Sequence, residues 1–259
     1  PAQGVPMTIE IRGTLVLVTA GLLAACSPAS DPRAKTAATP ATAEFNRAVA
    51  QALPLSDAQD FDDARRGFIA TDEPLAIVGP DGSALWQASD YAFVAGDAPP
   101  TVNPSLWRQA QLNGLHGLFE VVPGVWQVRG YDLANMTLIE GETGWILVDP
   151  LTANETAAAA LALARRHLGD RPISAIVFTH SHADHFGGVA GVLPDDPAAA
   201  ARIPIVAPAG FMEEATSENT LAGIAMTRRA AFMYGTPLPR SPTGHVDTGL
   251  GKAPAIGTL

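Results

Sequence analysis

Three histidines and an aspartate gather in the segment THSHADHFGG at residues 179–188: His180, His182, Asp184 and His185. The chain contains six histidines in all, so half of them fall in this one segment. Imidazole nitrogens and carboxylate oxygens are ligands that zinc and similar metal ions prefer. The spacing therefore predicts a metal site at these four residues.

Side chains alternate in direction along an extended chain, and this alternation assigns the four predicted ligands to two metal ions. Residues two apart in an extended segment point the same way, so His180 and His182 can bind the first ion. Asp184 and His185 lie in the following turn and can face a second ion. Two such cations can hold a hydroxide, lower its pKa to about 7 and clamp the reacting group, while Asp184 orients the hydroxide or accepts its proton. The motif therefore indicates metal-dependent hydrolysis, with a solvated loop or a structural zinc site as alternatives.

Elements typical of an α/β domain surround the motif. The apolar residues 173–178 precede it and predict a strand buried on both faces, and ligands gather at the carboxyl ends of such strands. Gly187 and Gly188 follow the motif and can open a helix. An Ala-rich run at residues 154–168 predicts a helix, and residues 203–207 predict another buried strand. Strands that alternate with helices predict a mixed sheet.

Four short β-rich runs lie upstream and predict a meander, at residues 119–122, 125–129, 136–140 and 145–148. Still earlier, the turn sequence Gly-Pro-Asp-Gly at residues 79–82 predicts a hairpin between residues 75–78 and 84–86. Helical spacing of apolar residues predicts short helices at residues 45–53 and 105–114, and a short helix or turn at residues 61–69. A further helical region is expected at residues 210–234.

Composition excludes several classes of protein. Apolar residues make up 47% of the 259, which is too many for an intrinsically disordered chain. The net charge is −10 and there is no basic cluster, which argues against a nucleic-acid partner. A single cysteine excludes a disulfide within the chain.

Residues 1–26 resemble an export signal of the lipoprotein type. The apolar stretch at residues 14–25 has the length of a signal-peptide core and is too short for a membrane span. It ends in Leu-Ala-Ala-Cys, so that Cys26 stands where bacterial lipoproteins are cleaved and lipidated. We therefore expect an exported protein that is periplasmic or anchored to the outer membrane through Cys26. An ordinary secretory signal and a buried N-terminal strand are the alternatives.

The remainder of the chain divides into three parts. Residues 27–44 are rich in Ala, Ser, Thr and Pro, which predicts a flexible linker. Residues 45–117 are expected to form a small N-terminal extension. Residues 118–259 contain the meander and the histidine motif, and we expect them to form the catalytic domain.

The histidine motif in this setting resembles the metallo-β-lactamase superfamily. The long flanks, from residue 119 to residue 252, are similar to its alkylsulfatase branch, the enzymes that hydrolyse alkyl sulfate detergents. This resemblance implies an αβ/βα sandwich, two zinc ions, cleavage of an alkyl sulfate ester to an alcohol and sulfate, and a homodimer in the complete protein. The alternatives are another hydrolase of the superfamily, acting on a β-lactam, lactone or thioester, and an inactive, truncated lipoprotein that binds zinc.

The sequence departs from the alkylsulfatase family in one respect. In that family, glutamates and a further histidine well downstream of the motif complete the metal site, and a helical dimerisation domain and a sterol-carrier-like domain follow. No matching segment is found among the 259 residues. We therefore expect the chain to be the N-terminal part of a longer protein, with only the N-terminal half of the sandwich fold.

Several other side chains have weaker claims to a role. Asp149 ends a predicted strand and could orient the metal loop. Arg228 and Arg229 could bind a sulfate ester through paired hydrogen bonds, although a surface pair on a helix is the preferred interpretation. Local completion of the metal site is considered for five residues, but a ligand role is not favoured for them because exposed helix carboxylates are usually solvated: Glu213, Glu214, Glu218, His245 and Asp247. Three methionines are expected to fill the core: Met212, Met226 and Met233.

Overall fold

A computed structural model of the chain describes residues 37–252, and the structural statements below concern this part. The predicted signal segment, Cys26 and most of the predicted linker lie outside the described residues, as do residues 253–259. The described residues all belong to one unit by their internal contacts. Among their helices, none combines the length and apolar character needed to cross a membrane.

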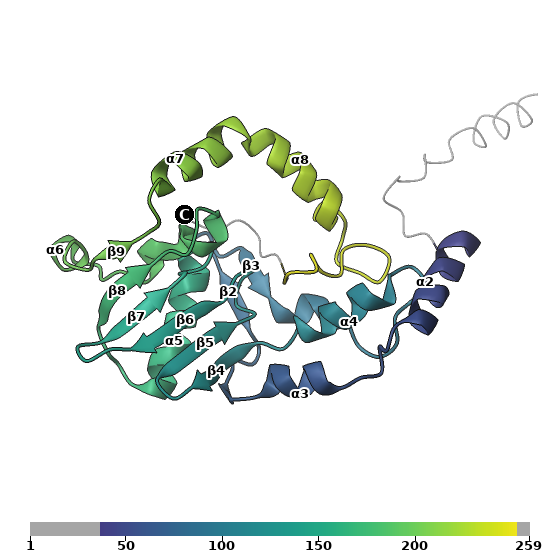
Figure 1. Cartoon of the computed structure of the whole chain (residues 1–259), viewed down its shortest axis with the longest axis horizontal. Coiled ribbons are helices and arrows are strands. Elements are labelled where there is room, and N and C mark those ends of the chain that lie inside the picture. Colours follow the sequence, from purple (N-terminus) through teal and green to yellow (C-terminus); the bar gives the residue numbers. More distant parts are fainter. Residues whose placement is uncertain (1–36, 253–259) are drawn as a thin grey trace, which may run out of the picture. The chain divides into compact units, whose positions relative to one another are not determined.

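Seven strands form one mixed sheet in the order β1-β4-β5-β6-β7-β8-β9 (Figure 1). The strands are β1 (Phe68–Ala70), β4 (Gly117–Val122), β5 (Val125–Arg129), β6 (Met136–Glu140), β7 (Trp145–Val148), β8 (Ile173–Val177) and β9 (Ile205–Val206). Neighbours from β1 to β7 are antiparallel, whereas β7, β8 and β9 are parallel. The predicted meander and the mixed α/β sheet are therefore confirmed.

Glycine turns and alternating burial explain the meander. Gly124, between β4 and β5, has a φ angle of 81°, which glycine adopts without strain. Along β6, Met136 and Leu138 are fully buried, while the residues between them are only partly covered. Leu147 on β7 is also fully buried, opposite Leu138. Because of this alternation, every second side chain of a strand points into the core.

Helix α5 (Asn154–Leu168) lies behind the sheet in the view of Figure 1 and packs against its core side chains. Its buried side consists largely of alanine and leucine, and small side chains allow close packing of helix and sheet. The helix ends before Gly169, which has a φ angle of 94° and donates its N–H to the Arg165 carbonyl. The predicted bounds of this helix are confirmed, and the helix connects the parallel strands β7 and β8.

The segment before β4 contains strand β1, one hairpin and several helices: α2 (Pro40–Ala52), α3 (Gln59–Arg65), β2 (Ala76–Val78), β3 (Ala84–Gln87), η1 (Ala88–Tyr91) and α4 (Pro104–Leu112). The hairpin and the helices at residues 45–53 and 105–114 were predicted. The helix or turn predicted at residues 61–69 is wrong at its C-terminal end, because the helix ends at Arg65 and residues 68–70 form β1, which pairs with β4. The predicted linker is wrong at its C-terminal end, because α2 begins at Pro40 and includes residues 40–44. Proline fits the first turn of a helix, and the Thr39 hydroxyl caps this one by accepting from the Thr42 N–H.

The prediction of a second buried strand at residues 203–207 is wrong in length and burial. Strand β9 has two residues, and Ile205 and Val206 are 47% and 55% exposed. It pairs with β8 on one side and is the last strand in the order of the sheet within the described residues. Its apolar side chains therefore extend the sheet without entering the core.

The helical region predicted at residues 210–234 comprises α7 (Phe211–Thr216), the π-helical turn η4 (Ser217–Leu221) and α8 (Gly223–Tyr234). Figure 1 shows α7 and α8 as one arch. The predicted burial of three methionines is wrong: Met212, Met226 and Met233 are exposed. The reason is that the arch leaves this side of its helices uncovered within residues 37–252.

Candidate metal centre

The predicted ligands lie together directly beyond the carboxyl end of β8. A loop carries His180 and His182, and the short helix η2 (Ala183–His185) carries the other two predicted ligands. The ring centroid of His180 lies 4.6 Å from that of His182 and 4.1 Å from that of His185. Strand β8 thus delivers three imidazole groups to one place, as the spacing of the motif predicts.

Asp149 fixes this loop from the neighbouring strand. Its Oδ1 accepts from the Thr179 N–H at 2.8 Å, and its Oδ2 accepts from the Thr179 hydroxyl at 2.7 Å. His185 Nδ1 lies 2.8 Å from the same Oδ2. Because a carboxylate only accepts, His185 must donate its Nδ1 proton to Asp149, so Nε2 is the ring nitrogen that a metal ion could use. The predicted orienting role of Asp149 agrees with these contacts.

The backbone that presents Asp149 is strained. Asp149 and Leu151 have φ angles of 56° and 65°, in the left-handed region that favours glycine. Each such residue costs roughly 1–3 kcal/mol and persists only where the surroundings hold it. The Leu151 carbonyl accepts from the Gly188 N–H at 2.9 Å, so this strained turn touches the short helix η3 (Gly187–Gly191). The expected helix start at the two glycines is confirmed as a 3-10 helix.

Two carboxylates lie within ion-pair range of the imidazoles. Asp184 Oδ2 is 3.4 Å from His185 Nε2. Glu218 Oε1, on the π-helical turn η4, is 3.4 Å from His182 Nε2. A ligand role for Glu218 was not favoured from the sequence, because only the fold brings η4 to the histidine loop. The other acidic candidates on α7, Glu213 and Glu214, are exposed.

His245 and Asp247 belong to a different cluster. His245 Nδ1 is 3.1 Å from the Tyr91 hydroxyl. Asp247 accepts from Lys252 Nζ at 2.7 Å and from Asn113 Nδ2 at 2.9 Å. These contacts connect both residues to the segment at residues 91–113.

The donor set was tested for its fit to a metal. Three imidazoles and a carboxylate are chemically suited to zinc. Partial burial, followed by repulsion from His185 and His182, lowers the pKa of His180. A lowered pKa favours the neutral imidazole that binds metal. Within the part of the chain that the structure describes, however, no three His, Cys, Asp or Glu side chains form a group that could hold an ion as they stand. The donors fit zinc in type and lie close together, but they do not converge.

A cleft of about 1070 Å³ opens beside the histidine loop. His182, Asp184 and Glu218 line one side of it. Residues of α8 line it as well, among them Arg228, Arg229 and several apolar residues. The two arginines therefore face the same cleft as the predicted ligands.

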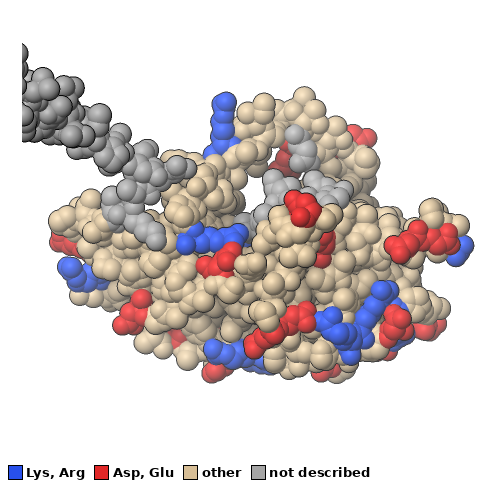
Figure 2. All heavy atoms as spheres, turned by 180° about the vertical axis from the view of Figure 1, so that it is seen from behind, with Lys and Arg blue, Asp and Glu red and all other residues tan. Residues whose placement is uncertain are grey.

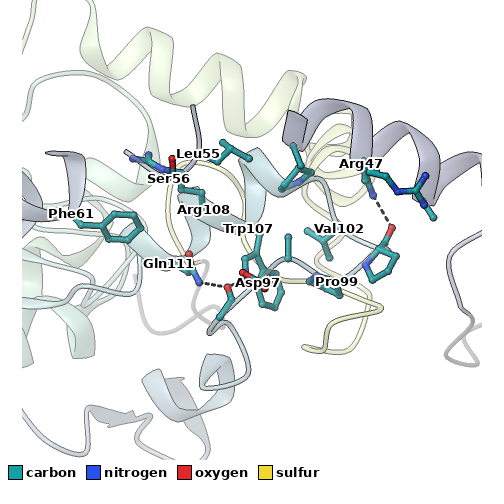
Figure 3. Close-up of a pocket in the computed structure, with 17 residues that line it drawn as sticks. Arg47, Leu55, Ser56, Phe61, Asp97, Pro99, Val102, Trp107, Arg108 and Gln111 are labelled. Atoms are coloured by element: carbon teal, nitrogen blue, oxygen red, sulfur yellow. Dashed lines mark hydrogen bonds between the residues drawn. The ribbon is translucent and has the colours of Figure 1, made fainter. Parts of the chain in front are cut away.

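A second pocket, of about 560 Å³, lies apart from the histidines, between α2, α4 and the loop at residues 96–100 (Figure 3). Its polar side chains mainly bond to the protein itself. Asn46 donates to the Pro100 carbonyl, and Trp107 and Gln111 both donate to the Gly96 carbonyl. These bonds join the segments of the N-terminal extension to one another, so we assign this pocket no chemistry.

Fold and site together define an α/β domain with a histidine-rich loop at a strand end. The profile described as Metallo-beta-lactamase superfamily matches residues 129–253. This range contains the meander from β6 onward, α5, β8, the histidine loop and the arch. Residues 129–253 therefore form part of a metallo-beta-lactamase-like α/β fold.

Relatives of high identity are alkylsulfatases. The chain is 47% identical over 221 residues to an alkyl/aryl-sulfatase of Saccharomyces cerevisiae, covering 85% of this chain and 34% of that protein. It is also 47% identical over 250 residues to an (R)-specific secondary-alkylsulfatase of a Pseudomonas species, covering 95% of this chain and 36% of the relative. A solved structure of a stereoselective inverting sec-alkylsulfatase from Pseudomonas matches with a TM-score of 0.80 and 46% identity, over 87% of this chain and 36% of that one. The chain thus spans about a third of the length of these relatives.

Proposed function

We propose that this chain carries the histidine loop of a hydrolase that cleaves alkyl sulfate esters. The observation that carries the proposal is the gathering of three imidazoles beyond β8, with His185 oriented by Asp149. The identity of 47% to three proteins named as alkylsulfatases supports the substrate class.

Each predicted ligand has a role in this proposal. His180 and His182 would hold a first zinc ion, and Asp184 and His185 a second. Zinc held by these residues would lower the pKa of a bound water and so supply hydroxide near neutral pH. Asp149 keeps the Nε2 lone pair of His185 free, and Asp184 orients the attacking oxygen or accepts its proton.

The cleft beside the histidine loop suits an amphiphilic substrate. Arg228 and Arg229 supply positive charge for the sulfate group, and guanidinium groups bind such oxyanions through paired hydrogen bonds. Ile224, Met226 and Met233 line the same cleft and offer apolar surface to the alkyl chain. The ester and one water molecule give an alcohol and hydrogen sulfate, whether the water attacks carbon or sulfur.

Zinc content and turnover test this proposal together. We expect the complete protein to bind two equivalents of zinc and to release sulfate from dodecyl sulfate. His182→Ala should lower zinc content to about one equivalent and reduce turnover at least ~100-fold, because it removes a direct ligand. The matched control is His167→Ala, an exposed histidine on α5, which should change neither quantity.

Three outcomes would contradict the proposal in different ways. Zinc binding with hydrolysis of nitrocefin, a simple lactone or a thioester in place of dodecyl sulfate would favour another hydrolase of the superfamily. Two equivalents of zinc without any hydrolysis would favour a zinc-binding protein. Undiminished zinc content in His182→Ala would remove the ligand assignment itself.

A further inference from the structure

A second buried carboxylate lies behind the strained turn that presents Asp149. We propose that Asp132 is a positioning residue for the metal centre, acting through the turn at residues 149–153 and never touching the metal or the substrate. Asp132 precedes β6 in the chain and is 2% exposed. Nothing in the spacing of the histidine motif points to it.

The Asp132 carboxylate holds the far end of this turn with several bonds. Its Oδ2 accepts from the Thr152 N–H at 3.1 Å, and its Oδ1 accepts from the Thr152 hydroxyl at 2.6 Å. The Thr156 hydroxyl, in the first turn of α5, donates to Oδ2. Oδ1 also accepts from the Leu133 N–H at 2.6 Å, which fixes the carboxylate to its own loop. A buried carboxylate with four donors is a rigid anchor.

Thr152 is next to Leu151, one of the two residues with a left-handed φ angle. The bonds from Asp132 therefore act directly on the strained part of the backbone. At the other end of the same turn, Asp149 holds Thr179 and His185. A chain of direct contacts thus runs from Asp132 through Thr152 and the turn to Asp149 and the imidazole of His185.

Relaxation of the turn has a specific expected effect. Without the bonds from Asp132, the left-handed backbone is free to relax toward ordinary φ angles. That movement shifts the Asp149 carboxylate away from His185 Nδ1. His185 then loses its preference for the tautomer with the proton on Nδ1, which the Asp149 contact imposes. A role for Asp132 only in starting helix α5 would lower stability without changing this tautomer.

The proposal rests on the proposed metal site, but its first test uses the metal-free chain. In the wild type, side-chain ¹⁵N spectra should show His185 with its proton on Nδ1 and a bare Nε2. In Asp132→Asn, we expect His185 to become a mixture of tautomers and zinc affinity to fall about tenfold or more. Thr152→Val, which removes only one hydroxyl, should shift the tautomer in the same direction, and Thr152→Ser should restore the wild-type spectrum.

The matched control is Asp247→Asn. Asp247 is also a buried carboxylate with side-chain and backbone donors, but its partners are Asn113, Gly249 and Lys252. This variant should lose stability while leaving the His185 tautomer and zinc affinity unchanged. A folded Asp132→Asn or Thr152→Val with an unchanged His185 spectrum would overturn the proposal. A complete wild-type protein that shows the expected tautomer but binds no zinc would instead overturn the proposed function.

Discussion

At the scale of single residues, His245 is a buried imidazole in which only one of the two ring nitrogens has a hydrogen-bond partner within the described residues. Nδ1 lies 3.1 Å from the Tyr91 hydroxyl, while Nε2 is buried and has no hydrogen-bond partner within the described residues. Burial lowers the pKa of His245. Asp247 opposes this shift, whereas Arg240 and Lys252 add to it. The folded chain therefore keeps this imidazole neutral at pH values where the unfolded chain binds a proton.

The lowered pKa of His245 predicts a loss of stability in mild acid. Below about pH 6.5 the unfolded state takes up the proton first, so the free energy of unfolding falls as pH falls. Urea denaturation at about pH 7.5 and about pH 5.5 should show a smaller loss for His245→Gln than for the wild type. His167→Gln, at an exposed site on α5, serves as the control and should lose as much as the wild type. Equal losses in all three proteins would contradict the prediction.

The ligand types of the metal centre were predictable from sequence because a strand end and a two-residue period place side chains locally. Asp149 was also predictable, since it ends the neighbouring strand. Glu218 and Asp132 were not, because each reaches the site from a distant segment. The contact of Glu218 with His182 depends on the π-helical turn of the arch, and the bonds of Asp132 depend on where α5 begins.

At the scale of elements, the close approach of η3 to the strained turn is made possible by glycine. A Cβ atom on Gly188 would collide with the carbonyl oxygen of Pro150 and lie 2.5 Å from that of Ala153. Both oxygens belong to the backbone and cannot rotate away. Gly188 is therefore required where the histidine loop packs against the turn.

Gly188→Ala should accordingly separate these two elements. Overpacking of this kind costs about 1–3 kcal/mol of unfolding free energy, and we expect zinc affinity to fall with it. The measurement is urea denaturation combined with a zinc titration. Gly223→Ala is the control, because the nearest atom to its Cβ would be 3.8 Å away and the residue lies in α8, where alanine is tolerated. A Gly188→Ala protein as stable as Gly223→Ala would show that the packing can adjust.

Element prediction succeeded where hydrophobic pattern and turn residues agreed, as in β4 to β8 and α5. It failed for β9 because an apolar run does not reveal whether a strand lies at the edge of a sheet. Ile205 and Val206 resemble buried strand residues in sequence, yet within residues 37–252 β9 pairs only with β8. The predicted burial of the methionines in the arch was wrong for a related reason. Helical spacing shows that a helix has an apolar face, but it does not show what packs against that face.

At the scale of the whole described chain, charge and apolar surface are unevenly distributed. Figure 2 shows acidic and basic side chains interspersed along the edge opposite the arch, while the arch itself is mostly uncharged on this face. Leu221 and Phe232 on the arch are 83% and 89% exposed, and Ile224 is exposed as well. These apolar side chains together form an exposed hydrophobic patch.

This apolar arch predicts strong binding of a hydrophobic fluorescent dye by the folded chain. Replacing Ile224 and Phe232 together by serine should reduce dye fluorescence several-fold without lowering the melting temperature, because neither side chain is buried. Phe45→Ser, which removes a 63% exposed ring from α2, should reduce the signal only slightly. An unchanged signal in the double variant would place the dye elsewhere.

The order of strands in the sheet also has a consequence for the kinetics of folding. Each pairing within β4 to β7 closes a short turn, whereas pairing of β7 with β8 closes a loop that contains all of α5. The entropy lost on closing a loop grows with its length, so the meander is expected to form before β8 docks. Asp149 and the histidine loop lie on opposite sides of that longer closure. The contacts of Asp149 with Thr179 and His185 therefore form at a late step of folding, after the meander is in place.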